Sequence, residues 1–385
     1  MTQEREWESK LAQMDIDELN IATIRTLAMD MVQAANSGHP GAPMGCAAMA
    51  HVLWSRHMKL APNHVGWSNR DRFVLSNGHA STLLYGLLHL NGYPVSLDDL
   101  KQFRQMGSIT PGHPENHVTP GIDTTTGPLG QGIANAVGFA IAESHLAARY
   151  NRPGHDVVDH YTYAICGDGC LMEGISAEAA SIAGHLGLSK LIVLYDNNHI
   201  TIDGTTDVSF TEDVCARFEA HQWNVLRVED GTDLEAIDAA ITLAKSQHEK
   251  PTLISVRNHI GFGSPHMQDT SKVHGSPLGA EEIRLTKAAY GWPEDAQFFV
   301  PERVAKSRSE RVAKHDAAYD AWKRGFEAYR AEYPELAQEF ERRMRGELPE
   351  GWDALDAFEP GKAMATRAAG GKVLSALHAK LPELM

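Results

Sequence analysis

Hydrophobic residues in the first ninety positions recur mainly at helical spacing. Residues 15–36 place apolar side chains three and four positions apart and are followed closely by a glycine, which predicts a helix that leads into the loop SGHPGAPMG. Residues 45–60 show a second amphipathic pattern, and residues 70–93 indicate a short strand, a turn and a helix. The loop and the turn therefore present His39 and His79 beside residues that bend the backbone.

The middle of the chain changes to short β-rich runs that alternate with helical patterns. Residues 111–132 are rich in Gly, Pro and Thr, and they precede a helix of small residues. The β-rich runs HYTYAIC and KLIVLYDNN flank a predicted helix over residues 175–188, and a helix over residues 233–247 leads into the strand PTLISVRNHI. This alternation indicates an α/β fold whose mostly parallel sheet carries helices on both faces.

A change in composition marks the last part of the chain. Residues 303–345 are charged and helical, residues 347–362 are loop-like, and residues 365–384 begin another helix. We therefore expect a main domain over residues 1–325. Residues 326–385 would be a linker and the start of a truncated next domain.

Composition and charge narrow the class of protein. The 385 residues are 43% hydrophobic, and no apolar run reaches the roughly 20 residues of a membrane span, which predicts a soluble globular protein without a membrane partner. A net charge of -15 disfavours nucleic acid as a partner. The N-terminus has no signal-peptide pattern, and the cysteines form no C-x-x-C pair, which suits reduced thiols in the cytoplasm. They are Cys46, Cys166, Cys170 and Cys215.

Polar residues follow both β-rich runs of the central βαβ unit. GDG contains Asp168, and DNN ends at Asn198. Since ligands of parallel sheets bind beyond the carboxyl ends of the strands, the carboxylate, the amide oxygen and the Ile200 carbonyl could converge on one Mg²⁺ or Ca²⁺. Gly169 and the helix that follows could add N–H donors to a bound diphosphate. An Asp between glycines is more often a simple turn, so the prediction depends on the pair of motifs.

The loop TTGPLGQG, which contains Gly127, has glycines but matches neither a P-loop nor a dinucleotide-binding fingerprint. It could be a tight turn packed against a helix, or a backbone edge that closely approaches a flat cofactor. From the loop alone, the simple turn is the better interpretation.

Four histidines lie in loops beside Gly or Pro. His39, His79, His113 and His274 occur in SGHPG, SNGHA, TPGHPE and KVHGS. A single exposed histidine is usually only part of the surface. Four in similar settings suggest imidazoles that converge on a pocket, where they could bind hydroxyl groups and relay protons near neutral pH.

Taken together, the motifs resemble the transketolase family over essentially the whole chain. They occur in the order seen in transketolases: SGHPGAPMG, LSNGHASTLLYGLLHL, TPGHPE, TTGPLGQGIANAVG, GDGCLMEG, YDNNHITIDG, IGFGSP, VHGSPL and ATR. The GDG and NN pair alone is shared by many thiamine diphosphate enzymes, so the resemblance rests on the whole set. It implies the thiamine-diphosphate-binding fold, with the diphosphate-binding domain in residues 1–325.

The resemblance also implies roles for individual residues. Asp168, Asn198 and the Ile200 carbonyl would hold the divalent metal. The diphosphate would contact Gly169, His79 and His274. The thiazolium and aminopyrimidine region would be lined by Gly127, Leu129, Ile202 and Ile260.

Further implied roles concern the substrate and a paired subunit. The four loop histidines, His39, His79, His113 and His274, would surround the reacting end of the substrate, and Arg367 would bind a sugar phosphate. Glu173 would be a buried acid that links paired sites across a dimer, or simply a carboxylate at a helix N-terminus. Asp269 stands where the family usually has Gly-Thr, and we expect diphosphate binding to survive this difference.

The implied reaction moves a two-carbon ketol unit from a ketose phosphate to an aldose phosphate, with thiamine diphosphate supplying the chemistry. Relatives continue into a pyrimidine-binding domain, which carries the glutamate that protonates the aminopyrimidine. The resemblance therefore implies either a homo-oligomer or a partner chain that carries the pyrimidine domain.

Two other hypotheses remain open from the sequence. The chain could belong to another thiamine-dependent enzyme, although TPGHPE and ATR favour a transketolase. It could also be a non-catalytic module that binds thiamine diphosphate or only associates with a partner.

Overall fold

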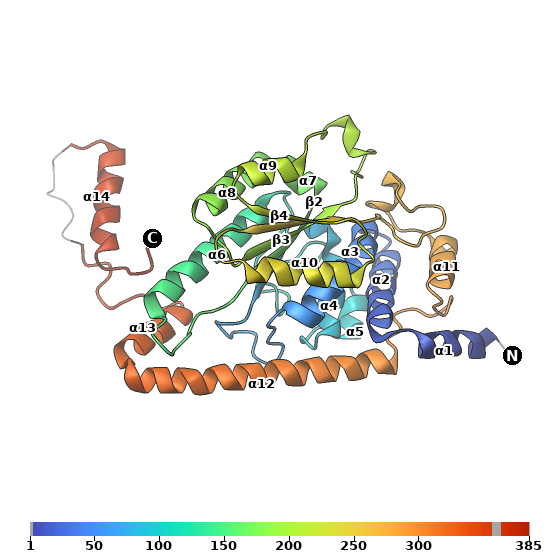
Figure 1. Ribbon diagram of the computed structural model, residues 1–385, viewed down its shortest axis with the longest axis horizontal. Helices are drawn as coiled ribbons and strands as arrows, with labels where there is room; N and C mark the ends of the chain where they lie inside the picture. The colour runs from blue at the N-terminus through green and yellow to red at the C-terminus, as the bar shows by residue number, and fades with distance from the viewer. Residues whose placement is uncertain (1–2, 356–362, 385) are drawn as a thin grey trace. The chain divides into compact units, whose positions relative to one another are not determined.

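A computed structural model describes residues 3–355 and 363–384 of the chain (Figure 1). The prediction of a linker over residues 347–362 therefore falls partly on residues 356–362, which lie outside the described part. Helices alternate with strands as the sequence predicts, and all the strand pairs in the described residues are parallel. The strands are β1 (Arg72–Leu75), β2 (Thr162–Gly167), β3 (Leu191–Asn197), β4 (Asn224–Val228) and β5 (Thr252–Arg257).

The strands form a five-stranded sheet in the order β1-β2-β3-β5-β4. Consecutive residues of β2 face opposite sides: Tyr163 and Ile165 belong to one buried cluster, and Ala164 and Cys166 to the other. Because both of their faces are buried, β2, β3 and β5 are almost continuously apolar, as is usual in parallel sheets. This confirms the predicted fold class.

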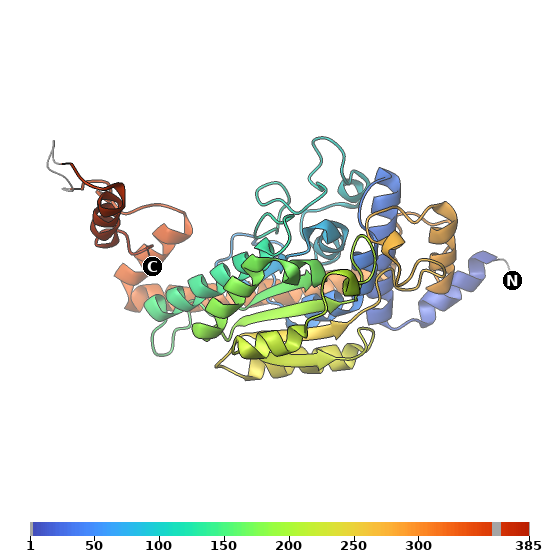
Figure 2. The ribbon, with the colours of Figure 1, turned by 90° about the horizontal axis from the view of Figure 1, so that it is seen from above.

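Helices cover both faces of the sheet, as Figures 1 and 2 show from two directions. On one face lie α2 (Ile16–Ala35), α3 (Gly41–Val52), α4 (Ser81–Leu90) and α10 (Leu234–Ser246). On the other face lie α6 (Gln131–Tyr150), α7 (Asp168–Met172), α8 (Gly174–His185) and α9 (Val214–Ala220). The remaining helices are α1 (Gln3–Gln13), α5 (Leu97–Lys101), α11 (Ala280–Ala289), α12 (Glu302–Glu332), α13 (Pro334–Met344) and α14 (Thr366–His378).

Helix α2 shows how local sequence sets the helix ends. Its N-cap Asp15 accepts a hydrogen bond from the Asp17 N–H and forms a capping box with Glu18. Asn36 ends the helix in the left-handed conformation, with φ of 48°. The chain then turns into the loop that carries His39, so the capping residues place this histidine at the end of a buried helix.

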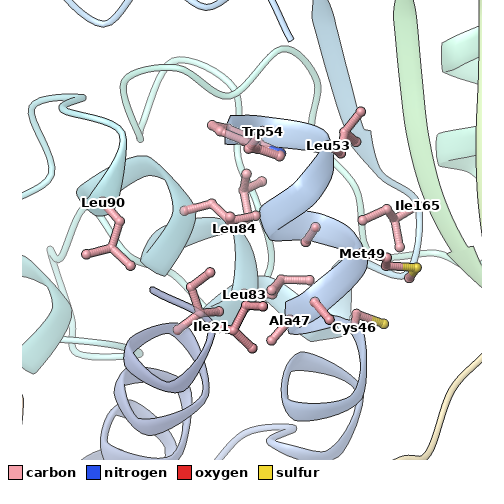
Figure 3. Close-up of a cluster of buried hydrophobic side chains, with 14 of the residues drawn as sticks. Ile21, Cys46, Ala47, Met49, Leu53, Trp54, Leu83, Leu84, Leu90 and Ile165 are labelled. Atoms are coloured by element: carbon pink, nitrogen blue, oxygen red, sulfur yellow. The ribbon is translucent and has the colours of Figure 1, made fainter. Parts of the chain in front are cut away.

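The larger of the two buried clusters fills the space between the sheet and the helices α2, α3 and α4. In Figure 3, Met49 of α3 lies beside Ile165 of β2, and Ile21 of α2 and Leu84 of α4 belong to the same cluster. At about 1.5–3 kcal/mol for each fully buried large apolar side chain, this cluster is a major stabilising feature of the fold. It holds the loops between these elements in fixed positions at one edge of the sheet.

Several boundaries differ from the sequence prediction. The helix predicted over residues 45–60 begins at Gly41, because Pro43 is tolerated in a first helical turn, and after Val52 it continues as a π-helical turn, Leu53–His57. The long charged region divides into α12 and α13 at Tyr333, and Pro334 starts α13.

Strand β4 and helix α9 were not predicted. Strand β4 is a half-exposed edge strand, so it lacks the apolar run that marks a buried strand. Helix α9 has only seven residues, too few for a clear helical period.

Contacts divide the chain into two compact units. Met1–Leu146 and Asp159–Ala321 form the first unit, and Ala147–Val158 with Trp322–Met385 form the second. The first unit contains the sheet. In the second, Glu339 of α13 accepts hydrogen bonds from Arg149 and Tyr150 of α6. The domain boundary at residue 325 stays a prediction.

Candidate cofactor site

The predicted polar motifs meet at the carboxyl edge of the sheet. Strands β2 and β3 are neighbours, as the βαβ pattern predicts, with Gly167 directly opposite Asp196. A pocket of about 490 Å³ opens beyond these strand ends. It is lined by the predicted residues His39, His79, His113, Gly127, Leu129, Asp168, Gly169, Asn198, Ile200, Ile202, Ile260 and His274. The fold thus brings most of the predicted site residues together.

Asp168 begins helix α7 directly after β2 and is only 4% exposed. Its Oδ1 accepts a hydrogen bond from the Tyr195 hydroxyl, whereas its Oδ2 is buried without a partner among the described residues. Burial raises the pKa of this carboxyl to about 6, against the opposing effect of the Tyr195 hydrogen bond. A buried carboxylate oxygen without a partner is costly, and a bound cation would satisfy it.

Asn198 is oriented by a buried network behind the pocket. Its Nδ2 donates to Asp196 Oδ2 at 2.8 Å, and its Oδ1 accepts from the Ile200 N–H at 2.9 Å. The other Asp196 oxygen accepts from Asn258 Nδ2 at 2.9 Å. The amide oxygen of Asn198 therefore faces the Ile200 loop, and its second lone pair is available to a cation. His199 between them has φ of 62°, which makes the bend that the sequence predicts.

Three of the loop histidines form a cluster in the pocket. The ring centroid of His79 lies 5.0 Å from that of His39 and 5.1 Å from that of His274, and the rings of His39 and His274 are 5.6 Å apart. Burial, followed by the neighbouring histidines, lowers the pKa of His79 to about 3; burial and nearby positive groups lower that of His39 to about 4. Both rings are therefore neutral at pH 7, when each can donate one hydrogen bond and accept another.

The glycine loop, TTGPLGQG at residues 125–132, lies against the turn after β1. A Cβ on Gly78 would come within 2.9 Å of the Gly127 nitrogen, and a Cβ on Gly132 would lie 2.5 Å from the Ser76 Cα. The ring of His113 is also close, since a Cβ on Gly127 would be 3.5 Å from it. Close packing explains why positions 78 and 132 are glycines. Gly127 also lines the pocket, so its backbone is accessible to a ligand.

Apolar side chains close the remaining walls. Ile260 is buried, Leu129 is half-buried, and Ile202 is 65% exposed at the rim. Leu129 packs beside the start of α7, because a Cβ on Gly169 would lie 3.0 Å from it. Polar groups in the depth of the pocket and apolar groups at its sides are typical of cofactor sites.

Two predicted residues do not line this pocket. Glu173 follows α7 and is exposed in this chain, beside Gly130. Its predicted burial concerned a dimer and stays a prediction. Arg367 is exposed on α14 in the second unit, and its predicted role with a sugar phosphate also stays a prediction.

Sequence reasoning missed several residues of the site, and three of them have informative polar contacts. Asn77 lines the pocket, and its Oδ1 is buried without a partner among the described residues. Asp196 orients Asn198, and its position at the end of a buried strand could have signalled this. Arg104 donates to Ser37 Oγ at 2.8 Å and lies 3.5 Å from His39 Nδ1, a contact between distant segments that no local pattern shows.

The loop that departs from the usual family pattern is held by its own contacts. Asp269 has φ of 59°, a left-handed conformation that Asp tolerates better than most residues. Its carboxylate pairs with His259 at 2.8 Å, and its N–H donates to the Ile260 carbonyl at 3.0 Å. The loop that carries His274 is therefore ordered in this chain with Asp269 in place.

Two kinds of feature are absent within residues 3–355 and 363–384. No group of three or more His, Cys, Asp or Glu side chains is placed to hold a metal ion. The predicted metal site would combine one carboxylate with amide and carbonyl oxygens, so it is not a cluster of this kind. No described helix is long and apolar enough to span a membrane.

The fold and the pocket define an α/β domain with a candidate cofactor site at the carboxyl edge of its sheet. Comparison with known proteins gives its family. Residues 16–349 match the family model described as "Transketolase, thiamine diphosphate binding domain". The chain belongs to the transketolase family, and these residues correspond to its thiamine diphosphate binding domain.

Individual relatives agree with this assignment. The chain is 54% identical to the transketolase of Geobacillus stearothermophilus, over 96% of this chain and 56% of that protein. It is 55% identical to that of Bacillus subtilis (strain 168), over 95% of this chain and 55% of that protein. The solved structure of transketolase from Leishmania mexicana superposes with a TM-score of 0.93 at 49% identity, over 97% of this chain and 55% of that one. The chain thus spans about half the length of the relatives it matches.

Proposed function

We propose that the chain binds thiamine diphosphate together with Mg²⁺ or Ca²⁺ in this pocket, as the diphosphate-binding component of a transketolase. The observation that carries the proposal is the buried Asp168 Oδ2, which has no partner among the described residues and lies at the strand edge next to Asn198. The cation would be held by Asp168, the Asn198 amide oxygen and the Ile200 carbonyl.

The remaining pocket residues suit the organic part of the cofactor. Gly169 and the start of α7 offer N–H groups to a diphosphate, while His79 and His274 offer ring nitrogens. His274 Nδ1 is buried without a partner among the described residues, so it is available for such a contact. Leu129, Ile202 and Ile260 supply apolar surface for the rings of the cofactor.

Thiamine diphosphate, when bound, supplies the electron sink that allows a carbon–carbon bond next to a carbonyl to break. The chain's own contribution is to orient the substrate and to move protons. Neutral imidazoles at His39, His79 and His113 can accept a proton from a sugar hydroxyl or donate one to a carbonyl oxygen. Their lowered pKa values keep them in this form at neutral pH.

The substrates and partners follow from the family assignment as proposals. We propose ketose and aldose phosphates as substrates, with Arg367 as a phosphate ligand. We also propose that a homo-oligomer or a second chain provides the pyrimidine side of the active site, with Glu173 at that contact. A cytoplasmic location rests on the cysteines, all four of which are buried and unpaired. One relative is a chloroplastic transketolase of Zea mays, so location varies within the family.

Isothermal titration of thiamine diphosphate in the presence of Mg²⁺ tests the binding proposal. Asp168→Asn keeps the shape of the side chain but removes its charge, and it should weaken Mg²⁺-dependent binding about 100-fold. The matched control is Asp98→Asn, which changes an exposed carboxylate on α5 and should bind like the parent chain. Equal affinity of the parent chain and Asp168→Asn would refute the assignment of Asp168 as a metal ligand.

A turnover measurement distinguishes the hypothesis of an enzyme component from that of a non-catalytic binding module. A ketol donor and ribose 5-phosphate are incubated with the chain, the cofactor and Mg²⁺, with and without a polypeptide that carries the pyrimidine domain. We expect turnover only in the complete mixture and its loss with Asp168→Asn. Cofactor binding without turnover in the complete mixture would favour the binding module instead.

A further inference from the structure

Arg25 on helix α2 is a buried cation without an acidic partner in the part of the chain that the structure describes. Its side chain lies in the interior, with the residue only 8% exposed. Its Nε donates to the Met44 carbonyl at 2.9 Å, and no ion pair joins its guanidinium to a carboxylate among the described residues. The buried Lys287, in contrast, pairs with Asp30 at 2.6 Å. A buried guanidinium is expected to have such a counter-ion, because desolvation of an unpaired charge is costly.

Two aromatic rings flank the guanidinium. Its central carbon lies 4.2 Å from the ring centroid of Phe262 and 5.6 Å from that of Tyr290. The Tyr290 hydroxyl donates to the Phe262 carbonyl, so it is already engaged. The rings stabilise the cation through their faces, but they offer no acceptor in the plane of the guanidinium, where its N–H groups point.

A cavity of about 460 Å³ lies beside this cation. Arg25, Phe262 and Tyr290 line it together with apolar residues of α2, α3 and α10, among them Ile21 and Leu234. The volume lies in the range of small-molecule sites, roughly 300–1,000 Å³. Among the described residues, none lines both this cavity and the cofactor pocket, so the two are separate.

Glu18 is the acidic residue at this cavity. It belongs to the capping box of α2, where its carboxylate accepts a hydrogen bond from the Asp15 N–H at 3.3 Å. Its charge disfavours a second anionic group at that side of the cavity. A ligand with one anionic end, placed at Arg25, and an apolar body avoids this repulsion.

We propose that this cavity is a second ligand site, which binds a small molecule with a carboxylate or phosphate group on an aromatic body. Arg25 is the anion partner, and its planar fork of donors matches both groups. Phe262 and Tyr290 contact the aromatic body. The ligand supplies the counter-ion that the fold does not provide.

The test uses fluorine NMR of the full chain with 4-fluorobenzoate as the probe. Its matched control is 4-fluorobenzyl alcohol, which has the same ring without the charge. We expect saturable broadening of the benzoate signal and at least about tenfold weaker binding of the alcohol, because the alcohol cannot form a charge-assisted hydrogen bond with Arg25. Equal binding of the two probes would overturn the proposal.

Variants of the chain show where the 4-fluorobenzoate probe binds. Arg25→Met should weaken benzoate binding at least about tenfold, whereas Arg284→Met, the same change at a partly exposed arginine, should leave it unchanged. Leu234→Trp should also abolish binding, since it fills the cavity from α10 with Arg25 in place. This second variant decides the question if Arg25→Met does not fold. Asp168→Asn should leave probe binding unchanged, and a loss there would place the probe in the cofactor pocket and refute the second site.

Discussion

Buried polar side chains of the described residues differ in whether the fold gives them a hydrogen-bond partner. Asp196 and Asn198 satisfy each other at 2.8 Å, and Asp30 is paired with Lys287. Asp168 Oδ2 and Asn77 Oδ1 have no partner among the described residues, and both residues line the cofactor pocket. Since a buried carboxylate or amide oxygen without a partner is costly, two such atoms that line one pocket are a functional signal.

His160 provides a residue-scale prediction about pH. It is 4% exposed, and burial, followed by the positive charges of Arg72 and Lys59, lowers its pKa to about 2. The unfolded chain protonates this ring at about pH 6.5, so the contribution to stability is complete above that pH and is lost as the pH falls. Relative to His160→Gln, the parent should lose about 2 kcal/mol of unfolding free energy between pH 6.5 and 5.

Urea unfolding followed by circular dichroism at several pH values measures this difference. The control is the same substitution at the exposed His248. Parallel pH profiles for the parent and His160→Gln would show that His160 does not contribute to acid sensitivity.

At the scale of the elements, periodicity predicted the buried strands and the helices of the sheet faces. Strands β2, β3 and β5 are central and apolar on both sides, so each stands out as an apolar run. The edge strand β4 has no such run, and the register of the pairs depends on contacts between segments far apart in the sequence. Local pattern therefore indicates which segments are strands more reliably than where they lie in the sheet.

Helix α6 allows a matched test of its packing against β1. In Gly132→Ala the new Cβ would lie 2.5 Å from the Ser76 Cα, so the backbone must shift, and the variant should be destabilised by about 1–3 kcal/mol. Gly138 is exposed on the same helix with nothing within 4 Å of such a Cβ. Gly138→Ala should therefore stabilise the protein by about 0.4–1 kcal/mol.

Thermal or denaturant unfolding of both variants measures the contrast. Similar effects of the two substitutions would show that α6 does not pack tightly at Gly132. Because the glycine loop precedes α6, Gly132→Ala should also weaken binding of thiamine diphosphate, and Gly138→Ala should not.

At the scale of the whole molecule, several large apolar side chains are exposed on the surface. Ile182 and Leu186, four residues apart at the end of α8, are 50% and 51% exposed, and Ile202 is 65% exposed at the rim of the cofactor pocket. Residues four apart on a helix share one face. The adjacent pair Ile182 and Leu186 is therefore a candidate contact surface for another chain.

We predict that the isolated chain self-associates through this surface. The double variant Ile182→Lys, Leu186→Glu should reduce association in sedimentation velocity and lower the binding of a hydrophobic dye, because charged groups are costly to bury. Val208→Lys, which changes a residue that is 80% exposed outside α8, is the control. A parent chain that stays monomeric with little dye binding would contradict the prediction.

The sequence by itself determined the α/β class, most of the helices and strands, the family, and the motifs that carry the candidate chemistry. These features are local: they depend on side-chain periodicity, on turn residues such as Gly and Pro, and on the order of short motifs. Only the tertiary structure decided that Asn77 joins the cofactor pocket, that Arg104 reaches His39, and that Arg25 has no counter-ion among the described residues. The physical reason is that burial and charge pairing arise between segments distant in the chain, and no local pattern encodes which segments meet.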